Sequence, residues 1–141
     1  MFRLDGKSAL VTGASGGIGN AIARALHAQG AEVVLSGTRE EALQALAAEL
    51  GERAHVVTAN LGDAESVAAL AKSAEEIADG GIDILINNAG VTRDGLMMRM
   101  KDEDWEAVLN VNLTSGFRLS RALMRGMMKR RWGRVVGISS I

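Results

Sequence analysis

Three closely spaced glycines, Gly13, Gly17 and Gly19, lie between a short apolar run and a longer amphipathic one. A nucleotide pyrophosphate needs close backbone approach and the unpaired amides of a helix N-terminus. Gly13 suits a tight turn, Gly17 keeps a side chain out of the path of the phosphates, and Gly19 allows close helix packing. A flexible turn without a ligand is the alternative. The position at the first strand-to-helix junction favours a dinucleotide site, with Ser15 and Ile18 as further contacts.

The end of the second expected strand indicates which dinucleotide is bound. Enzymes that use NAD typically place an acidic residue there, on the ribose hydroxyls. This sequence reads Leu35-Ser36-Gly37-Thr38-Arg39, without an acid. The Thr38 hydroxyl and the Arg39 guanidinium suit the 2′-phosphate of NADP, so NADP is the predicted cofactor. The alternative is that Arg39 is only a solvated residue in the first turn of the next helix.

The composition excludes several other kinds of site. The 141 residues contain no cysteine and only two histidines, which removes disulfides and leaves few ligands for a metal. The net charge of −1 argues against a nucleic-acid partner. No apolar run approaches the roughly 20 residues that span a bilayer. The start of the sequence has no signal-peptide core, so we expect a cytoplasmic protein that binds no membrane.

The elements that position these residues alternate along the chain. Apolar runs predict strands over residues 8–12, 32–35, 54–59, 82–86 and 134–138. Amphipathic stretches predict helices over residues 17–29, 38–50, 63–78 and 105–130, the last of them bent near Asn112. Strands this apolar, each followed by a helix, suit a parallel sheet covered on both faces. We expect residues 1–141 to form a single Rossmann-type, doubly wound α/β domain with five strands in the order 3-2-1-4-5.

Capping signals mark three of the helix starts. Thr38 and Glu41 have the spacing of a capping box, in which each side chain satisfies a free amide of the other residue. Asp63 is suited to cap the helix that follows it. The acidic residues 102–104 place negative charge in a first helical turn, where the macrodipole favours it.

Three motifs together resemble the short-chain dehydrogenase/reductase family: residues 12–19, the segment Asn87-Asn88-Ala89-Gly90, and a strand that ends near Ser140. The stretch 91–105 is similar to that of the bacterial β-ketoacyl-acyl-carrier-protein reductases. The resemblance implies NADPH-dependent reduction of a 3-oxoacyl thioester on acyl carrier protein, in fatty-acid synthesis. Many NADP-dependent relatives carry arginine where this sequence has Gly16, which removes one contact to the 2′-phosphate.

The resemblance also assigns residue roles. Asn60 and Leu61 match positions that flank the adenine ring, and Asn88, Ala89 and Gly90 match the segment beside the nicotinamide ribose. Asn112 matches an asparagine that holds a water in a proton relay, and Ser140 matches a serine that hydrogen-bonds the substrate carbonyl. Taken singly, each has an ordinary alternative as a turn, a tie between helix segments or a strand end.

The family's proton donor is a tyrosine, with a lysine four residues later, and both lie downstream of the serine strand. This sequence contains no tyrosine. We therefore expect the chain to be the N-terminal part of a reductase, without the C-terminal strands, and to be inactive by itself. The alternatives are a reductase of acetoacetyl-coenzyme A or another ketone, and a non-catalytic module that binds NADP or a partner subunit.

Two surfaces of the long C-terminal helix are candidates for partners. Leu113, Phe117, Ser120, Met124 and Met127 form a stripe at helical spacing, for which core packing is the default expectation. The resemblance implies a homo-oligomer, a dimer or tetramer, with part of this stripe at the interface.

Another face of the same helix is basic and contains Arg118, Arg121, Arg125, Lys129, Arg130, Arg131 and Arg134. This face is either a solvated helix end or a docking patch for an acidic carrier protein. The resemblance implies the second, because Arg131 matches a position with which the family contacts the carrier protein.

Overall fold

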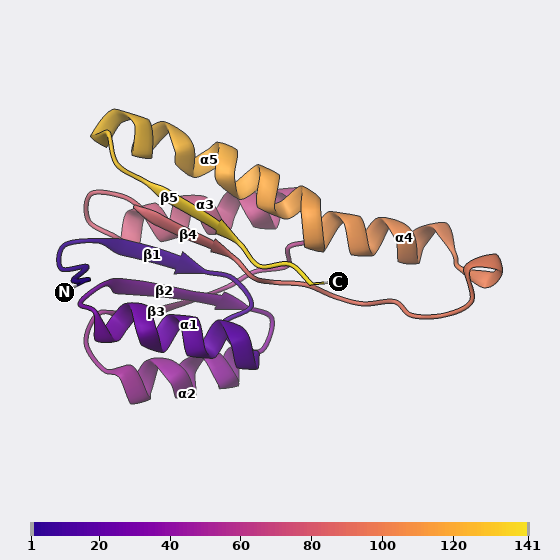
Figure 1. Cartoon of the computed structure of the whole chain (residues 1–141), viewed down its shortest axis with the longest axis horizontal. Coiled ribbons are helices and arrows are strands. Elements are labelled where there is room, and N and C mark those ends of the chain that lie inside the picture. The colour runs from indigo at the N-terminus through magenta and orange to yellow at the C-terminus, as the bar shows by residue number, and fades with distance from the viewer. Residues whose placement is uncertain (1, 141) are drawn as a thin grey trace.

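A computed structural model describes residues 2–140. Its strands are β1 (Ser8–Val11), β2 (Glu32–Gly37), β3 (Ala54–Thr58), β4 (Ile84–Asn87) and β5 (Arg134–Gly137). Its α-helices are α1 (Gly17–Ala28), α2 (Glu40–Leu50), α3 (Ala64–Ile77), α4 (Asp102–Leu109) and α5 (Ser115–Arg130). The strands form one parallel sheet in the order β3-β2-β1-β4-β5, which confirms the predicted topology (Figure 1).

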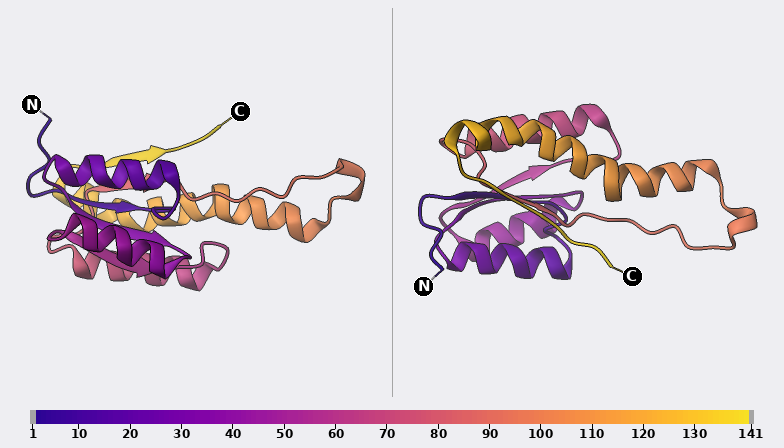
Figure 2. Two further views of the ribbon diagram at one scale, coloured as in Figure 1. Left: turned by 90° about the horizontal axis from the view of Figure 1, so that it is seen from below. Right: turned by 45° about the horizontal axis from the view of Figure 1, so that its top comes forward.

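Helices cover both faces of the sheet, and the alternation of side chains along β1 shows how (Figure 2). Leu10 is fully buried in a cluster with Leu70 of α3 and Leu119 of α5. Ala9 and Val11 point the other way, into a cluster that contains Ala23 of α1 and Leu43 of α2. Successive residues of a strand face opposite sides of a sheet, so a strand buried on both sides must be apolar throughout.

The predicted capping box of α2 is wrong. The helix begins at Glu40, its N-cap is Arg39, and no side chain caps it. Thr38 therefore lies before the cap position, where its hydroxyl cannot serve the first turn. The cap of α3 is confirmed, because the Asp63 carboxylate accepts a hydrogen bond from the Glu65 N–H at 3.3 Å.

The expected bend near Asn112 takes the form of a π-helical turn over Asn110–Thr114, between α4 and α5. A π-turn inserts an extra residue and changes which side of the following helix faces a given neighbour. The segment 91–101 runs outward from β4 beyond the end of the sheet, and α4 leads back beside it (Figure 1). No helix among the described residues is long and apolar enough to cross a bilayer.

Core packing was the default expectation for the methionine-rich stripe, and it is wrong for most of it. Leu113 and Phe117 are 66% and 59% exposed, and Met124 is 45% exposed, whereas Met127 is buried. The side of α5 that packs on the sheet and α3 presents Leu119, Leu123 and Met127 instead. Apolar residues occupy two sides of this helix, and only one of them meets the sheet.

Candidate functional site

The glycine loop joins β1 to α1 at the carboxyl edge of the sheet. Gly13 has a φ of +63°, and a Cβ there would lie 2.9 Å from Asn88 Nδ2. At Gly19 a Cβ would fall well inside van der Waals contact of the Gly13 carbonyl. A Cβ on Gly17 would meet nothing within 4 Å. Two of the glycines are therefore required by packing, and the third keeps space open above the loop.

The N-terminus of α1 is suited to an anion. Gly16 is its N-cap and supplies no side-chain hydrogen bond, and its first turn contains no acidic residue. The first amides of a helix have no partner within the helix and carry partial positive charge. Phosphate groups are the ligands that such a terminus binds best.

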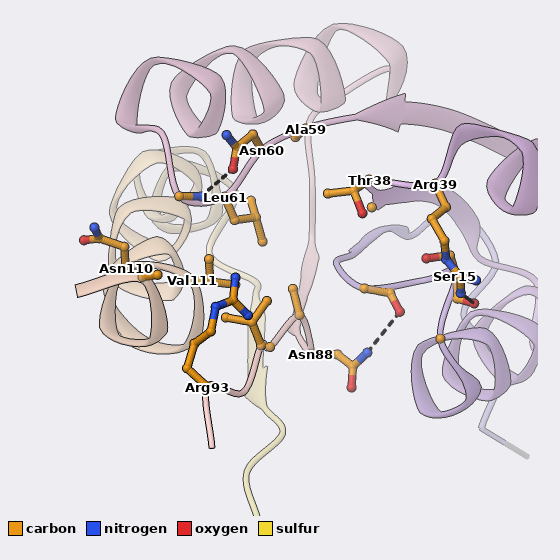
Figure 3. A pocket seen from close by; sticks show the side chains of 18 of the residues that line it. Ser15, Thr38, Arg39, Ala59, Asn60, Leu61, Asn88, Arg93, Asn110 and Val111 are labelled. Atoms are coloured by element: carbon orange, nitrogen blue, oxygen red, sulfur yellow. Dashed lines mark hydrogen bonds between the residues drawn. The ribbon is translucent and has the colours of Figure 1, made fainter. Parts of the chain in front are cut away.

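A set of hydrogen bonds joins the end of β1 to the segment after β4. The Thr12 hydroxyl accepts hydrogen bonds from the N–H groups of Asn88 and Ala89, each at 3.0 Å. The Asn88 side-chain amide donates to the carbonyls of Thr12 and Gly13, both at 3.2 Å. Figure 3 shows one hydrogen bond of the Asn88 amide. The glycine loop and the segment 88–90 are thus held together as one rigid floor.

A cavity of about 790 Å³ opens over this floor. Its size lies within the range of roughly 300–1,000 Å³ that is usual for ligand sites. The predicted site residues that line it are Gly13, Ser15, Gly17, Ile18, Thr38, Arg39, Asn60, Leu61, Asn88, Ala89 and Gly90. Residues from four separate parts of the chain therefore converge on one cavity at the carboxyl ends of the strands, where doubly wound sheets bind their ligands.

The Arg39 side chain reaches from the N-cap of α2 to the glycine loop. Its Nη2 donates a hydrogen bond to the Ser15 carbonyl at 2.9 Å, and the residue remains exposed at the mouth of the cavity (Figure 3). Thr38 lies beside it on the cavity wall. Arg39 is the N-cap residue of α2 and is exposed, yet its guanidinium lies against the loop that is suited to phosphates.

Asn60 is placed by two hydrogen bonds at the start of the turn after β3. Its backbone N–H donates to Ser66 Oγ at 2.8 Å, and its Oδ1 accepts from the Gly62 N–H at 3.0 Å. Asn60 lines the cavity, and its side-chain amide can both donate and accept hydrogen bonds. An adenine ring offers both a donor amine and ring acceptors, so this arrangement is compatible with the predicted contact.

Four predicted site residues do not line the cavity. Gly19 lies beneath the loop, packed against Gly13. The Asn112 side chain is engaged by Val91, accepting from its N–H at 2.7 Å and donating to its carbonyl at 2.9 Å. Ser140 follows β5 at the carboxyl edge of the sheet, and Arg131 ends α5 with a φ of +58°. The roles predicted for Asn112, Ser140 and Arg131 remain predictions.

Sequence reasoning missed the wall of the cavity that α4 and its neighbours form. The lining residues that were not predicted include Gly62, Val91, Arg93, Glu103, Glu106, Ala107, Asn110 and Val111. Glu103, Glu106, Ala107 and Asn110 recur at intervals of three and four, so they occupy one side of a helix. This spacing could have shown from the sequence that these residues share one side of the helix. It does not show that this side faces the cavity. Within residues 2–140 no group of histidine and acidic side chains could hold a metal.

Residues 7–141 match the family described as short chain dehydrogenase, and the chain belongs to this family. It is 59% identical over 141 residues to Nodulation protein G of Rhizobium sp. (strain N33), covering all of this chain and 57% of that protein. It is 50% identical over 141 residues to the 3-oxoacyl-acyl-carrier-protein reductase FabG of Escherichia coli (strain K12), covering 99% of this chain and 57% of that protein.

Among solved structures, a metagenomic short-chain oxidoreductase in complex with NADP superposes with a TM-score of 0.93 at 39% identity. The alignment covers 98% of this chain and 64% of that one. The chain therefore spans a little over half the length of the curated relatives that it matches. Its family membership and the fold of this neighbour support binding of a nicotinamide cofactor.

Proposed function

We propose that this chain is the NADP-binding part of an NADPH-dependent reductase that acts on 3-oxoacyl thioesters of acyl carrier protein in fatty-acid synthesis. The observation that carries the proposal is the convergence on one cavity of the α1 N-terminus, the Asn88–Gly90 segment and the pair Thr38 and Arg39. The substrate class rests on the similarity to 3-oxoacyl-acyl-carrier-protein reductases.

The residues of this chain would bind and orient the cofactor. The α1 amides would hold the pyrophosphate, and Thr38 and Arg39 the 2′-phosphate. Asn60 and Leu61 would contact the adenine, and Asn88, Ala89 and Gly90 the nicotinamide ribose. When bound, the cofactor would supply a hydride to the substrate ketone. The Ser140 hydroxyl would donate a hydrogen bond to the ketone oxygen and stabilise the negative charge that hydride transfer places there.

The same reaction needs a positioned proton donor. The 141 residues contain no tyrosine, the residue that serves as donor in the family the sequence resembles. Asn112 holds Val91 through both atoms of its side-chain amide, so it would act by positioning the segment beside the ribose. We expect the 141 residues to bind NADPH without oxidising it.

Two surfaces would serve partners. The exposed apolar residues Trp105, Leu109, Leu113, Phe117, Met124 and Met128 run along α4 and α5, and we propose that copies of the protein associate through them. Replacing Phe117 with Glu should then reduce the mass measured by light scattering.

On α5, Arg121, Arg125 and Lys129 are exposed, as is Arg131 at its end. They would attract an acidic carrier protein, with Arg131 as a contact.

A second candidate is a reductase of the same kind with another acyl or ketone substrate, such as acetoacetyl-coenzyme A. The observation that favours it is the 59% and 54% identity to two proteins named Nodulation protein G. A third is a non-catalytic module that binds NADP or a partner subunit, which the absence of tyrosine favours.

The first test is a titration of the protein with NADPH and NADH, followed by mixing with 3-oxoacyl thioesters. We expect NADPH to bind more tightly than NADH, and no consumption of NADPH by the 141 residues alone. Robust turnover by this chain would contradict the expected inactivity. When a tyrosine and lysine are supplied by a longer chain, the carrier-bound thioester should be reduced faster than its coenzyme A counterpart. The reverse order would favour the second candidate.

A further inference from the structure

Arg93 extends from the segment after β4 into the dinucleotide cavity (Figure 3). Its Nη1 donates a hydrogen bond to the carbonyl of the adjacent Thr92 at 2.9 Å. Its nearest carboxylate is that of Asp104, 3.9 Å from Nε, and 48% of the side chain is exposed. A guanidinium has five N–H groups and two flat faces, so this loosely held side chain keeps most of its binding capacity available.

The charges around Arg93 disfavour a phosphate. Its guanidinium points toward Val111, on the same side of the cavity as Leu61 and away from Ser15 and Arg39 (Figure 3). Glu103 and Glu106 also line the cavity, and each carries a carboxylate. They would repel an anion placed beside Arg93, whereas the glycine loop already offers the uncapped N-terminus of α1.

The remaining chemistry suits a neutral, flat ring. Leu61, Val111 and Ala107 supply apolar surface to the cavity, and carboxylates can accept hydrogen bonds from an exocyclic amine such as that of adenine. A planar guanidinium group stacks on an aromatic face and is attracted to it by the cation–π interaction. A compact ammonium group is also attracted to the ring, but it has no flat face with which to stack.

We infer that Arg93 is a binding residue of the adenine end of the cavity, where its guanidinium stacks on the base. The inference rests on the proposed function, because it needs a dinucleotide in the cavity. It adds to the residues predicted from the sequence a third side chain for the adenine, supplied by the segment after β4.

The test measures the affinities of NADPH and of 2′,5′-ADP, which contains the adenine and lacks the nicotinamide. Arg93→Ala is expected to weaken both ligands by a similar factor, about 3- to 10-fold from the usual strength of cation–π contacts. The Arg93→Lys variant is expected to bind both ligands nearly as weakly as the Arg93→Ala variant, because lysine keeps the charge but lacks the planar guanidinium group. The matched control is Arg99→Ala, which removes the same charge from an exposed position of the same segment that does not line the cavity.

Three results would overturn the inference. Full rescue by Arg93→Lys would show a simple charge contact to a phosphate. Loss of NADPH affinity with unchanged 2′,5′-ADP affinity would place Arg93 at the nicotinamide end. Unchanged affinity for both ligands would show that Arg93 makes no contact, while the proposed function would stand. If the unmodified protein binds neither ligand, the proposed function fails and the adenine subsite fails with it.

Discussion

The Thr12 hydroxyl accepts a hydrogen bond from the backbone N–H of Asn88 at 3.0 Å, across the ends of two neighbouring strands. The same oxygen accepts from Ala89 N–H at 3.0 Å and donates to the Ile86 carbonyl at 3.2 Å. Thr12 is 1% exposed, so no water substitutes for it. One buried side chain therefore sets the position of the segment after β4 relative to the glycine loop.

Replacing Thr12 with Val keeps the shape of the side chain and removes the acceptor of both N–H groups. We expect the free energy of unfolding in urea to fall by about 1–3 kcal/mol, the cost of leaving two half-buried N–H donors unpaired. NADPH affinity should fall as well, because Asn88–Gly90 lines the cavity. Thr12→Ser, which retains the hydroxyl, is the control and should lose much less. A Thr12→Val protein as stable as the original would contradict the bridging role.

Gly17 and Gly19 make a matched pair, since both lie in the first turn of α1. A Cβ at position 17 would enter open space, whereas at position 19 it would meet the Gly13 carbonyl and lie 2.7 Å from Asn88 Nδ2. We expect Gly17→Ala to retain the stability of the protein and lose NADPH affinity, because the methyl group occupies the path of the phosphates.

Gly19→Ala should instead lower the free energy of unfolding by about 1–3 kcal/mol or more, as overpacking does. Urea denaturation and a NADPH titration of both variants separate the two effects. A Gly17→Ala protein that binds NADPH normally would show that the phosphates do not approach this glycine.

The glycine loop could be predicted because its demands are local. There is no room for a Cβ at position 13 or 19, so both positions require glycine and the requirement is visible in the sequence itself. The parallel sheet could be predicted as well, because strands buried on both faces have to be apolar throughout. The α2 capping box failed because the spacing of Thr38 and Glu41 does not state where the helix begins. The first helical hydrogen bond accepts at Arg39, not at Thr38.

Side chains that depend on distant packing could not be predicted. Phe117 and Leu119 are both apolar and two residues apart, and only packing against the sheet and α3 decides that Leu119 is buried. The π-turn at Asn110–Thr114 adds to this difficulty, because it changes the phase between α4 and α5.

Asp83 and Arg130 join three elements at the edge of the sheet opposite the cavity. The Asp83 carboxylate accepts from Arg130 Nε at 3.2 Å and from the Ser8 N–H at 3.0 Å, and Arg130 also donates to the Ile82 carbonyl. The Asp83 side chain is 11% exposed and that of Arg130 is 29% exposed. Asp83→Ala should lower the free energy of unfolding by about 2–4 kcal/mol, since it leaves a half-buried cation and a buried N–H unpaired.

Urea denaturation checks the prediction for Asp83, with Asp79→Ala as the control because Asp79 is an exposed acid nearby. The affinity of the folded protein for NADPH should stay unchanged, because Asp83 lies away from the cavity. An equal loss of stability in both variants would show that the carboxylate pairing contributes little.

Arg3 and Asp5 give the molecule an acid-sensitive pair on its surface. The hydrogen bond from Arg3, at 2.8 Å, holds the pKa of the Asp5 carboxyl below its usual value, and the same bond raises the pKa of Arg3. A lowered pKa means that the stabilisation is present above the unfolded value of about 3.9 and is lost as the pH falls through the folded value. An NMR titration should give a lower Asp5 midpoint in the original protein than in Arg3→Gln. Equal midpoints would contradict the pairing.

Arg39 tests the choice of cofactor. Its guanidinium lies against the Ser15 carbonyl, and the end of β2 has no acidic residue to contact a free ribose hydroxyl. Because a charge-assisted hydrogen bond contributes about 1.5–3 kcal/mol, Arg39→Ala should weaken NADPH binding by about 10-fold or more. NADH lacks the 2′-phosphate, so its affinity should change little and serves as the internal control. Calorimetric titration with both cofactors measures the ratio. If Arg39→Ala weakens NADPH and NADH equally, Arg39 supports the glycine loop through Ser15 and does not select the 2′-phosphate.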